Sequence, residues 1–137
     1  MIRLARLAVA GFVAGALGVG ASVAAAQGSF QVDPNLASRG KVVYERNGCY
    51  ACHGFGRVLA GPDLQGVTER RDTAWVRRWL KETNNMLESD PQARAMLEQW
   101  RYVKMPQIKL SDNDVNALLH FMAQETARTR ALTQGAN

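Results

Sequence analysis

The residues best suited to chemistry lie in one short run, Cys49-Tyr50-Ala51-Cys52-His53. Two thiols three positions apart on a tight turn can each add to one vinyl group of a haem and form a thioether. The histidine that follows directly can then supply a nitrogen ligand to the iron. The spacing therefore predicts one covalently attached haem c, held by Cys49 and Cys52, with His53 as an axial ligand of its iron.

Three other kinds of site use some of these residue types. A Cys-x-x-Cys pair can form a thioredoxin-like disulfide, but that motif opens a helix in an α/β fold, and no strands are visible in this sequence. A zinc site takes four ligands, and the other histidine, His120, falls on a different predicted helix without cysteine partners. A purely structural disulfide leaves His53 unexplained. Haem attachment is favoured because it accounts for all three residues.

An electron-transfer haem needs a second axial ligand, and a methionine thioether is a ligand that stabilises the ferrous state. Met105 lies in an irregular stretch between two predicted helices. Pro106 follows it, removes a backbone donor and restrains the local chain. Since a ligand on a loop can approach the iron from the face opposite His53, Met105 is the predicted sixth ligand.

The other candidates for that ligand fit less well. Met96 and Met122 lie on apolar helix faces, where packing in the core is the expected role. Met86 follows Thr83-Asn84-Asn85, which has the composition of a loop. His120 lies opposite the apolar stripe of its helix, so we expect it in solvent.

Helix-start signals predict the elements that must position these residues. The predicted helices are residues 34–46 after Asp33, a second from Asp72 or Thr73, a third opened by Asp90-Pro91, and a fourth from the Ser111 cap to about Arg128. The segment 48–66 contains five glycines and one proline, which is typical of a loop. No segment alternates apolar and polar residues over a useful length, so the predicted fold class is all-α.

Length and composition fit one small globular domain. The chain has 137 residues, of which 47% are hydrophobic and 21% charged. The formal charge is +5, and without Arg3 and Arg6 in the N-terminal segment it falls to +3, with 15 basic and 12 acidic residues. A nucleic-acid-binding protein would concentrate more positive charge than this, so no nucleic-acid partner is expected.

The first 26 residues have the pattern of a secretory signal peptide. Two arginines precede the apolar stretch 7–19, and small residues end at Ala26, the predicted cleavage position. A retained membrane anchor is the alternative, and only then is membrane contact expected. The predicted organisation is a signal peptide over 1–26, an extension over 27–35, a domain over 36–128 and a flexible tail over 129–137.

The motifs together resemble the small monohaem class I cytochromes c of the bacterial periplasm. The matching runs, in order, are Cys49 to His53, Gly61-Pro62-Asp63-Leu64-Gln65-Gly66, Met105-Pro106 and Leu110-Ser111-Asp112. The resemblance implies the small cytochrome c fold, with four to five helices wrapped around one covalent haem. It also implies that the first and last helices cross, with Gly40 and Tyr44 against Leu118 and Phe121.

The resemblance implies roles for further residues. His53 and Met105 would be the axial iron ligands. The carbonyl of Pro62 would accept a hydrogen bond from the second ring nitrogen of His53. Trp100 resembles a tryptophan that in some members hydrogen-bonds a haem propionate, and simple core packing is its alternative role.

The implied function is one-electron transfer between periplasmic redox proteins, without enzymatic activity. With both axial positions filled, the iron has no open site for a substrate. Two alternatives remain: a haem subunit permanently docked on an oxidoreductase or oxidase, and a haem module whose labile Met105 bond lets the iron bind a small molecule.

Two sets of side chains are expected around the haem. Apolar groups should exclude water, namely Val58, Leu59, Leu64, Leu97 and Leu118. Basic groups should ring the exposed edge and steer an acidic partner, namely Arg46, Arg57, Lys104 and Lys109. Ordinary surface charge is the alternative interpretation of the basic set.

Overall fold

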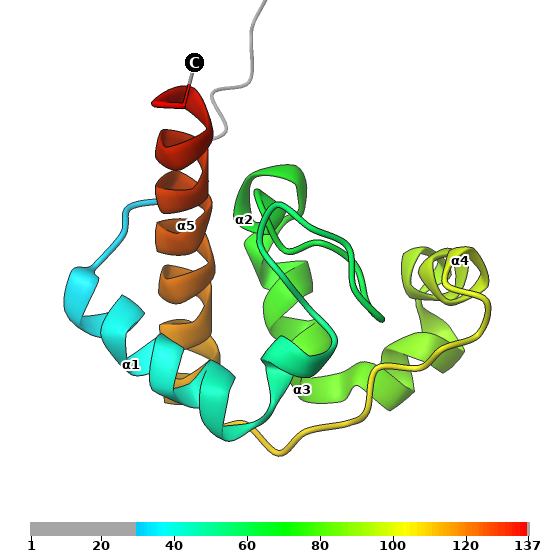
Figure 1. Ribbon diagram of the computed structural model, residues 1–137. Helices are drawn as coiled ribbons and strands as arrows, with labels where there is room; N and C mark the ends of the chain where they lie inside the picture. Colours follow the sequence, from blue (N-terminus) through cyan, green and yellow to red (C-terminus); the bar gives the residue numbers. More distant parts are fainter. Residues whose placement is uncertain (1–29, 137) are drawn as a thin grey trace, which may run out of the picture.

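The computed structural model describes residues 30–136, and these residues fold entirely into helices and irregular segments (Figure 1). In chain order the elements are α1 (Pro34–Arg46), the 3-10 turn η1 (Cys49–Ala51), α2 (Val67–Arg70), α3 (Thr73–Ser89), α4 (Pro91–Gln99) and α5 (Asp112–Gln134). No strand occurs within 30–136, so the all-α prediction is confirmed. The predicted leader lies outside the described residues.

The predicted helix starts are confirmed at their caps. The Asp33 carboxylate accepts hydrogen bonds from the backbone N–H groups of Asn35 and Leu36, at 2.8 and 3.2 Å, and Pro34 occupies the first turn of α1. At the start of α5, the Ser111 hydroxyl accepts from the Asp114 N–H while the Asp114 carboxylate accepts from the Ser111 N–H. These bonds satisfy N–H groups that have no partner inside the helix.

The first and last helices cross in direct contact, as the resemblance implies. The contact is closest at Gly40: a Cβ built there would lie 2.1 Å from the Ala117 carbonyl oxygen and 2.7 Å from Phe121 Cβ. Beside it the Tyr44 and Phe121 rings pack with their centroids 5.1 Å apart. Only a residue without a side chain allows two helix backbones to come this close.

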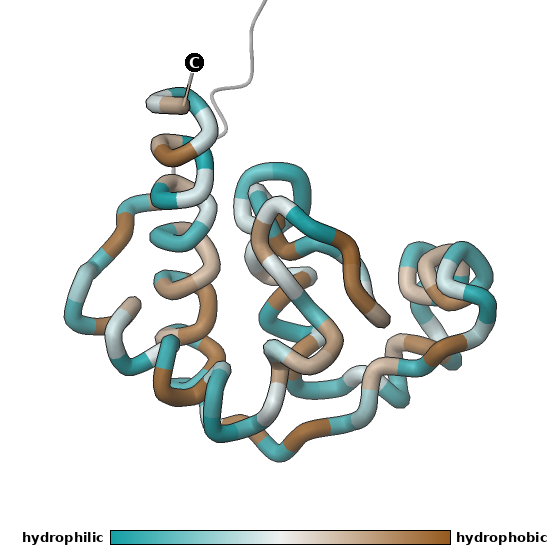
Figure 2. The backbone as a smooth tube through the Cα atoms, viewed as in Figure 1, coloured by the Kyte–Doolittle hydropathy of each residue, from teal (hydrophilic) through white to brown (hydrophobic). Residues whose placement is uncertain are grey.

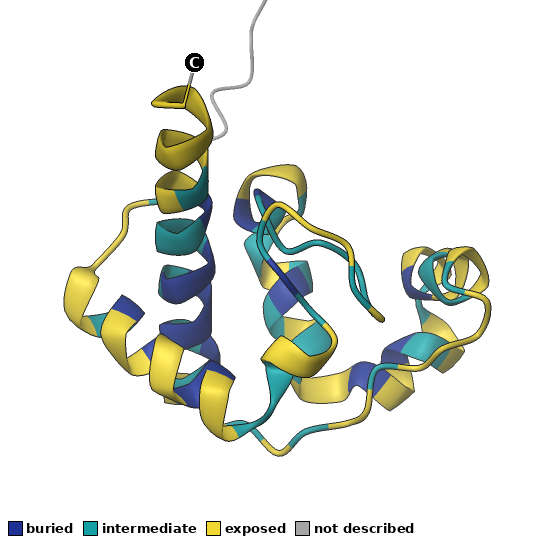
Figure 3. Ribbon diagram, viewed as in Figure 1, coloured by how far each residue is buried: buried dark blue, intermediate teal, exposed yellow. Residues whose placement is uncertain are grey.

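Around this crossing lies one hydrophobic core. Its buried members are Val43, Tyr44, Val76, Leu118, Leu119, Phe121 and Met122. Figure 3 shows the buried turns in the N-terminal half of α5, whereas its last turns are exposed. α5 also contacts α2 and α3, so it is the central helix of the described fold.

The helices α3 and α4 form a second unit that packs mainly on itself. α3 contains a kink at Glu82, where φ is −132° and ψ is 36°.

Thr83-Asn84-Asn85 was expected to be a loop and is helical instead, so this prediction was wrong. Its polar side chains find local partners that compensate: the Thr83 hydroxyl donates to the Trp79 carbonyl at 2.7 Å.

Two further boundaries differ from the prediction. The last helix continues past Arg128 to Gln134, so residues 129–134 are helical rather than a flexible tail. Arg130 pairs with Glu69 of α2 at 2.6 Å, which ties this extension to the rest of the fold. The single turn of α2 was not predicted, because four residues are too few for a periodic pattern.

Within residues 30–136, no helix combines the length and the apolar character needed to cross a bilayer.

Candidate functional site

The cysteine motif forms a tight turn directly after α1. Gly48 has a left-handed φ of 67° and ends the helix, and the His53 N–H donates to the Cys49 carbonyl at 3.0 Å across the turn. Within 30–136 the two thiols are not joined in a disulfide. The turn brings Cys49, Cys52 and His53 to the walls of two adjacent cavities.

These cavities lie between the α1–α5 core and the α3–α4 unit. Their volumes are about 270 and 90 Å³. They share six lining residues, His53, Pro62, Trp79, Met96, Trp100 and Met105. Most of the lining side chains are apolar, so the two cavities offer an apolar slot with a nitrogen donor and a thioether on its walls.

His53 is oriented by a backbone carbonyl. Its Nδ1 lies 2.9 Å from the Pro62 carbonyl oxygen. Because a carbonyl only accepts, Nδ1 carries the proton and donates, which leaves the lone pair of Nε2 available to a metal. Gly61 makes this approach feasible: a Cβ there would lie 2.7 Å from His53 Cε1.

Tyr44 holds the backbone of the same residue. Its hydroxyl donates to the His53 carbonyl at 2.6 Å and so joins α1 to the cysteine turn. Burial raises the pKa of Tyr44 to about 12, so the hydroxyl keeps its proton and stays a donor at any physiological pH. The histidine is thus fixed through both its ring and its backbone.

The loop that carries Pro62 is braced from both sides. The Asp63 carboxylate accepts from the backbone N–H groups of Gly56 and Gln65, at 2.9 and 2.8 Å. The Gly66 N–H donates to the hydroxyl of Thr126 on α5 at 2.9 Å. Arg70 donates to the Gln65 and Asp63 carbonyls. A loop with this many bonds can hold the Pro62 carbonyl in place.

Met105 lies in the irregular segment between α4 and α5. Apolar and polar residues are interleaved along this segment (Figure 2). The neighbours Lys104 and Pro106 are exposed, whereas Met105 is partly buried and lines both cavities. The Trp79 indole N–H donates to the Met105 sulfur at 3.2 Å. The segment starts with left-handed φ angles of 52° and 62° at Arg101 and Tyr102, which turn the chain out of α4.

The other candidates for an iron ligand differ in their position relative to the cavities. Met86 is fully buried in α3 and lines neither cavity. Met96 lines both cavities from α4, and Met122 lines the larger one from α5. His120 was expected in solvent, but it is partly buried: its Nδ1 accepts from the Asp33 N–H at 3.0 Å, and its ring packs on Phe30.

The alternatives to haem attachment find no support in this geometry. A thioredoxin-like site needs a thiol with a lowered pKa, and burial raises the pKa of the Cys49 thiol. Within 30–136, no group of three or more His, Cys, Asp and Glu side chains could hold a metal ion, whereas a structural zinc needs four such ligands.

The residues present fit a haem. The apolar slot suits a macrocycle, and Cys49, Cys52 and His53 line its walls. Arg71 lines the larger cavity with its guanidinium over the Trp75 ring, and within the described residues it forms no ion pair. Its guanidinium offers a positive charge to acidic groups of a haem bound in the cavity.

Some expected neighbours of the site lie elsewhere. Leu64, Leu97 and Leu118 line the cavities, whereas Val58 is 63% exposed and Leu59 lines neither cavity. Val58 was therefore wrongly expected to exclude water, because its apolar type gives no information on which way the loop turns it.

The four expected basic residues do not form one ring. Lys104 is exposed and lines the smaller cavity. Arg46 instead pairs with Asp114 across the α1–α5 crossing, at 3.3 Å. Arg57 and Lys109 are exposed and line neither cavity.

Two residues of the site, Trp79 and Arg71, were not predicted from the sequence. The four-residue spacing of Trp75 and Trp79 signals a shared face, but it does not indicate that one indole N–H reaches the Met105 sulfur. Trp100 lines both cavities, a position compatible with either of its expected roles.

Comparison with known proteins gives consistent matches. A sequence profile described as cytochrome c matches residues 37–126. The cytochrome c domain of a Pseudomonas putida protein is 38% identical with a TM-score of 0.60, and the match covers 69% of this chain and 94% of that one. A cytochrome c from Rhodothermus marinus is 26% identical with a TM-score of 0.66, covering 72% and 83%.

An engineered cytochrome c from Rhodothermus marinus, solved with a bound carbene intermediate, is 27% identical with a TM-score of 0.62, covering 71% of this chain and 82% of that one. No curated protein sequence shows significant similarity to the chain.

Proposed function

Because this chain belongs to the cytochrome c family, we propose that it is a periplasmic one-electron carrier whose haem iron is ligated by His53 and Met105. The attachment run Cys49 to His53 lies inside the matched region, so the chain binds haem c, which carries the iron, through covalent bonds. Its function is haem-based electron transfer. When bound, haem c supplies a one-electron Fe(III)/Fe(II) couple.

One observation carries the proposed ligation: His53 and Met105 line the same two cavities. His53 does so from the cysteine turn, and Met105 from the segment between α4 and α5. The Pro62 carbonyl leaves Nε2 of His53 as the free nitrogen, and Met105 is partly buried between the exposed residues Lys104 and Pro106. If His53 and Met105 both hold the iron, the protein would leave it no position for a substrate. The role is therefore transfer of electrons without enzymatic turnover.

The surroundings of the site favour the reduced state. With haem bound, the apolar cavity walls would exclude water and so favour the less charged ferrous centre. A thioether ligand acts in the same direction, because it donates weakly to ferric iron. Tyr44 and Pro62 hold His53 fixed, which limits rearrangement when the electron arrives or leaves.

A redox titration of the haem-loaded protein, with and without carbon monoxide, tests this proposal. We expect one reversible one-electron transition and a ferrous spectrum that carbon monoxide leaves unchanged, because both axial positions are occupied. Stoichiometric binding of carbon monoxide to the ferrous protein would instead indicate an open or labile position, and a small-molecule-binding module.

The partners are proposed to be other periplasmic redox proteins, approached through positive charge near the smaller cavity. Lys104 lines that cavity and Lys109 lies further along the same segment between α4 and α5, and neither forms an ion pair within the described residues. We expect the double change of both lysines to glutamate to slow oxidation of the reduced protein by hexacyanoferrate(III) roughly tenfold at low salt, because steering raises association rates of opposite charges.

Stopped-flow measurements over a series of ionic strengths check this expectation, since screening should remove the difference at high salt. Arg39→Glu, at an exposed position on α1 that forms no ion pair within the described residues, is the control for a single charge reversal and is compared with Lys104→Glu alone. If the two single changes slowed oxidation equally, overall charge and not a docking surface near Lys104 would account for the rate.

Export to the periplasm is proposed from the leader pattern in residues 1–26. Cleavage after Ala26 would leave the domain with its haem site in an oxidising compartment, where the family's electron carriers work.

A further inference from the structure

The Met105 sulfur accepts a hydrogen bond from an indole. Trp79 Nε1 lies 3.2 Å from Met105 Sδ, and within residues 30–136 this is the one hydrogen bond to the sulfur. The two residues come from α3 and from the irregular segment after α4. Met105 is on no regular element, so its side chain depends on contacts of this kind for a fixed orientation.

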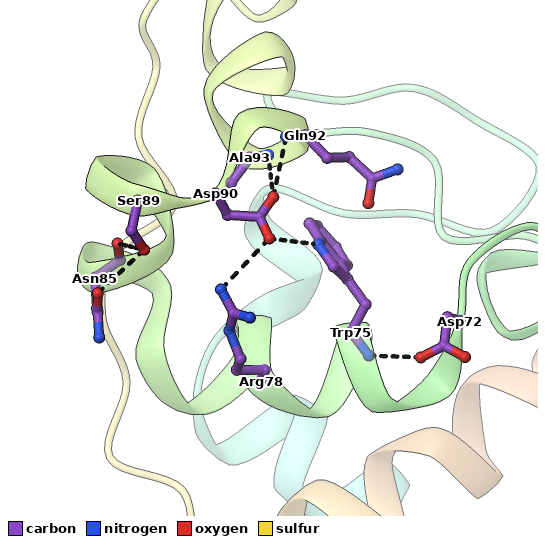
Figure 4. Close-up of polar contacts among 8 residues, drawn as sticks. All are labelled: Asp72, Trp75, Arg78, Asn85, Ser89, Asp90, Gln92 and Ala93. Carbon is purple, nitrogen blue, oxygen red and sulfur yellow. Dashed lines mark hydrogen bonds and ion pairs between the residues drawn. The ribbon is translucent and has the colours of Figure 1, made fainter.

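The donor is itself held in place. The Trp79 ring stacks on the Trp75 ring, with centroids 5.6 Å apart and an interplanar angle of 5°. The Trp75 indole N–H donates to the Asp90 carboxylate at 3.2 Å (Figure 4). The stack therefore has one end fixed to the start of α4 and the other end at the Met105 sulfur.

Asp90 is a firm anchor for that stack. Its second carboxylate oxygen accepts from the backbone N–H groups of Gln92 and Ala93, both at 3.0 Å, and Arg78 approaches the first at 3.4 Å (Figure 4). These bonds keep the pKa of Asp90 below its usual range, with the Ala93 N–H as the largest cause. The carboxylate is therefore charged at neutral pH and joins α3, α4 and the indole stack.

A thioether sulfur has two lone pairs. If one accepts the Trp79 N–H, the other is the one available to a metal, so the indole selects the direction in which Met105 donates. The bond also withdraws electron density from the sulfur and places a positive dipole end beside it. Both effects weaken donation to ferric iron more than to ferrous iron.

We propose that Trp79 is a positioning residue for the Met105 ligand, and that its N–H group raises the reduction potential of the haem. The inference rests on the ligation proposed above and adds the residue that sets its geometry. Trp75 and Asp90 act through Trp79 by holding its ring.

The test compares two replacements of Trp79 in the haem-loaded protein. Trp79→3-benzothienylalanine keeps the bicyclic ring and substitutes sulfur for the N–H group, while Trp79→Phe removes the donor and part of the ring. We expect each to lower the equilibrium constant for reduction about fivefold, which is roughly 40 mV for one electron, and to shift the near-infrared sulfur-to-iron band.

Met86→Ala is the control for a merely structural effect. Met86 is fully buried on the same helix and lines neither cavity, so this change should lower the melting temperature without moving the band or the potential. An unchanged potential and band in the benzothienyl protein would overturn the inference.

A measurement on the unmodified protein keeps the test independent of folding of the variants. In the reduced, diamagnetic state we expect a nuclear Overhauser effect between the Trp79 indole proton and the Met105 methyl protons. Its absence would contradict the inference. Absence of the near-infrared band in the unmodified oxidised protein would instead contradict the proposed Met105 ligation, so the two failures are distinguishable.

Discussion

Gly40→Ala is expected to destabilise the protein by at least about 2 kcal/mol, because the new methyl group meets backbone atoms. The added Cβ would lie 2.1 Å from the Ala117 carbonyl oxygen and 2.5 Å from its carbon. Rotation of a side chain cannot relieve this clash, so α1 and α5 must separate. The loss already allows for the gain of about 1 kcal/mol in helix propensity that alanine brings.

Thermal unfolding of the haem-loaded protein, followed by circular dichroism, measures this effect. The melting temperature should fall by on the order of 10 °C, since about 1 kcal/mol corresponds to roughly 4–8 °C in a domain of this size. Gly135→Ala is the matched control: Gly135 ends α5 with φ of −78°, and its Cβ would be 3.3 Å from the Ala131 carbonyl oxygen. A Gly40→Ala protein as stable as this control would show that the crossing tolerates a wider spacing.

Met105→Ala is expected to change the haem more than any other substitution outside the attachment run. Removing the thioether should abolish the near-infrared sulfur-to-iron band of the oxidised protein. The potential should fall by on the order of 100 mV, within the span of about 0.8 V over which axial ligands set haem potentials. Carbon monoxide should then bind to the ferrous protein at the vacated position.

Absorption spectra and a redox titration of the variant check these three outcomes together. Met86→Ala is again the comparison, because it removes a methionine that lies in the core and not at the cavities. A Met105→Ala protein that keeps the band would assign the ligand to another sulfur, and Met96 and Met122 on the cavity walls would be the next to replace.

Several features could be predicted because they depend on residues close together in the chain. The attachment run carries its chemistry in five consecutive residues. The caps Asp33, Asp90 and Ser111 act on N–H groups two or three positions further on, and all three helices begin where these residues predict. The predicted end of α5 near Arg128 was wrong, because no residue near Arg128 is of a type that ends a helix.

Other features depended on contacts between distant segments. Thr83-Asn84-Asn85 has a loop-like composition, yet it is helical, and the Asn84 N–H finds the Gln107 side chain at 3.1 Å. Val58 has an apolar side chain of a type common in protein cores, yet it is exposed. In both cases packing elsewhere in the fold outweighed the local preference of the residue type.

By itself, the amino-acid sequence determined the haem chemistry, the all-α class and the places where the main helices start. These follow from residue types and short spacings, which act over one or two turns of chain. Only the tertiary structure decided that Gly40 meets the Ala117 carbonyl and that the Trp79 indole reaches the Met105 sulfur. These contacts join residues 77 and 26 positions apart, and no local pattern sets them, because they arise when packed helices fix the distance between their side chains.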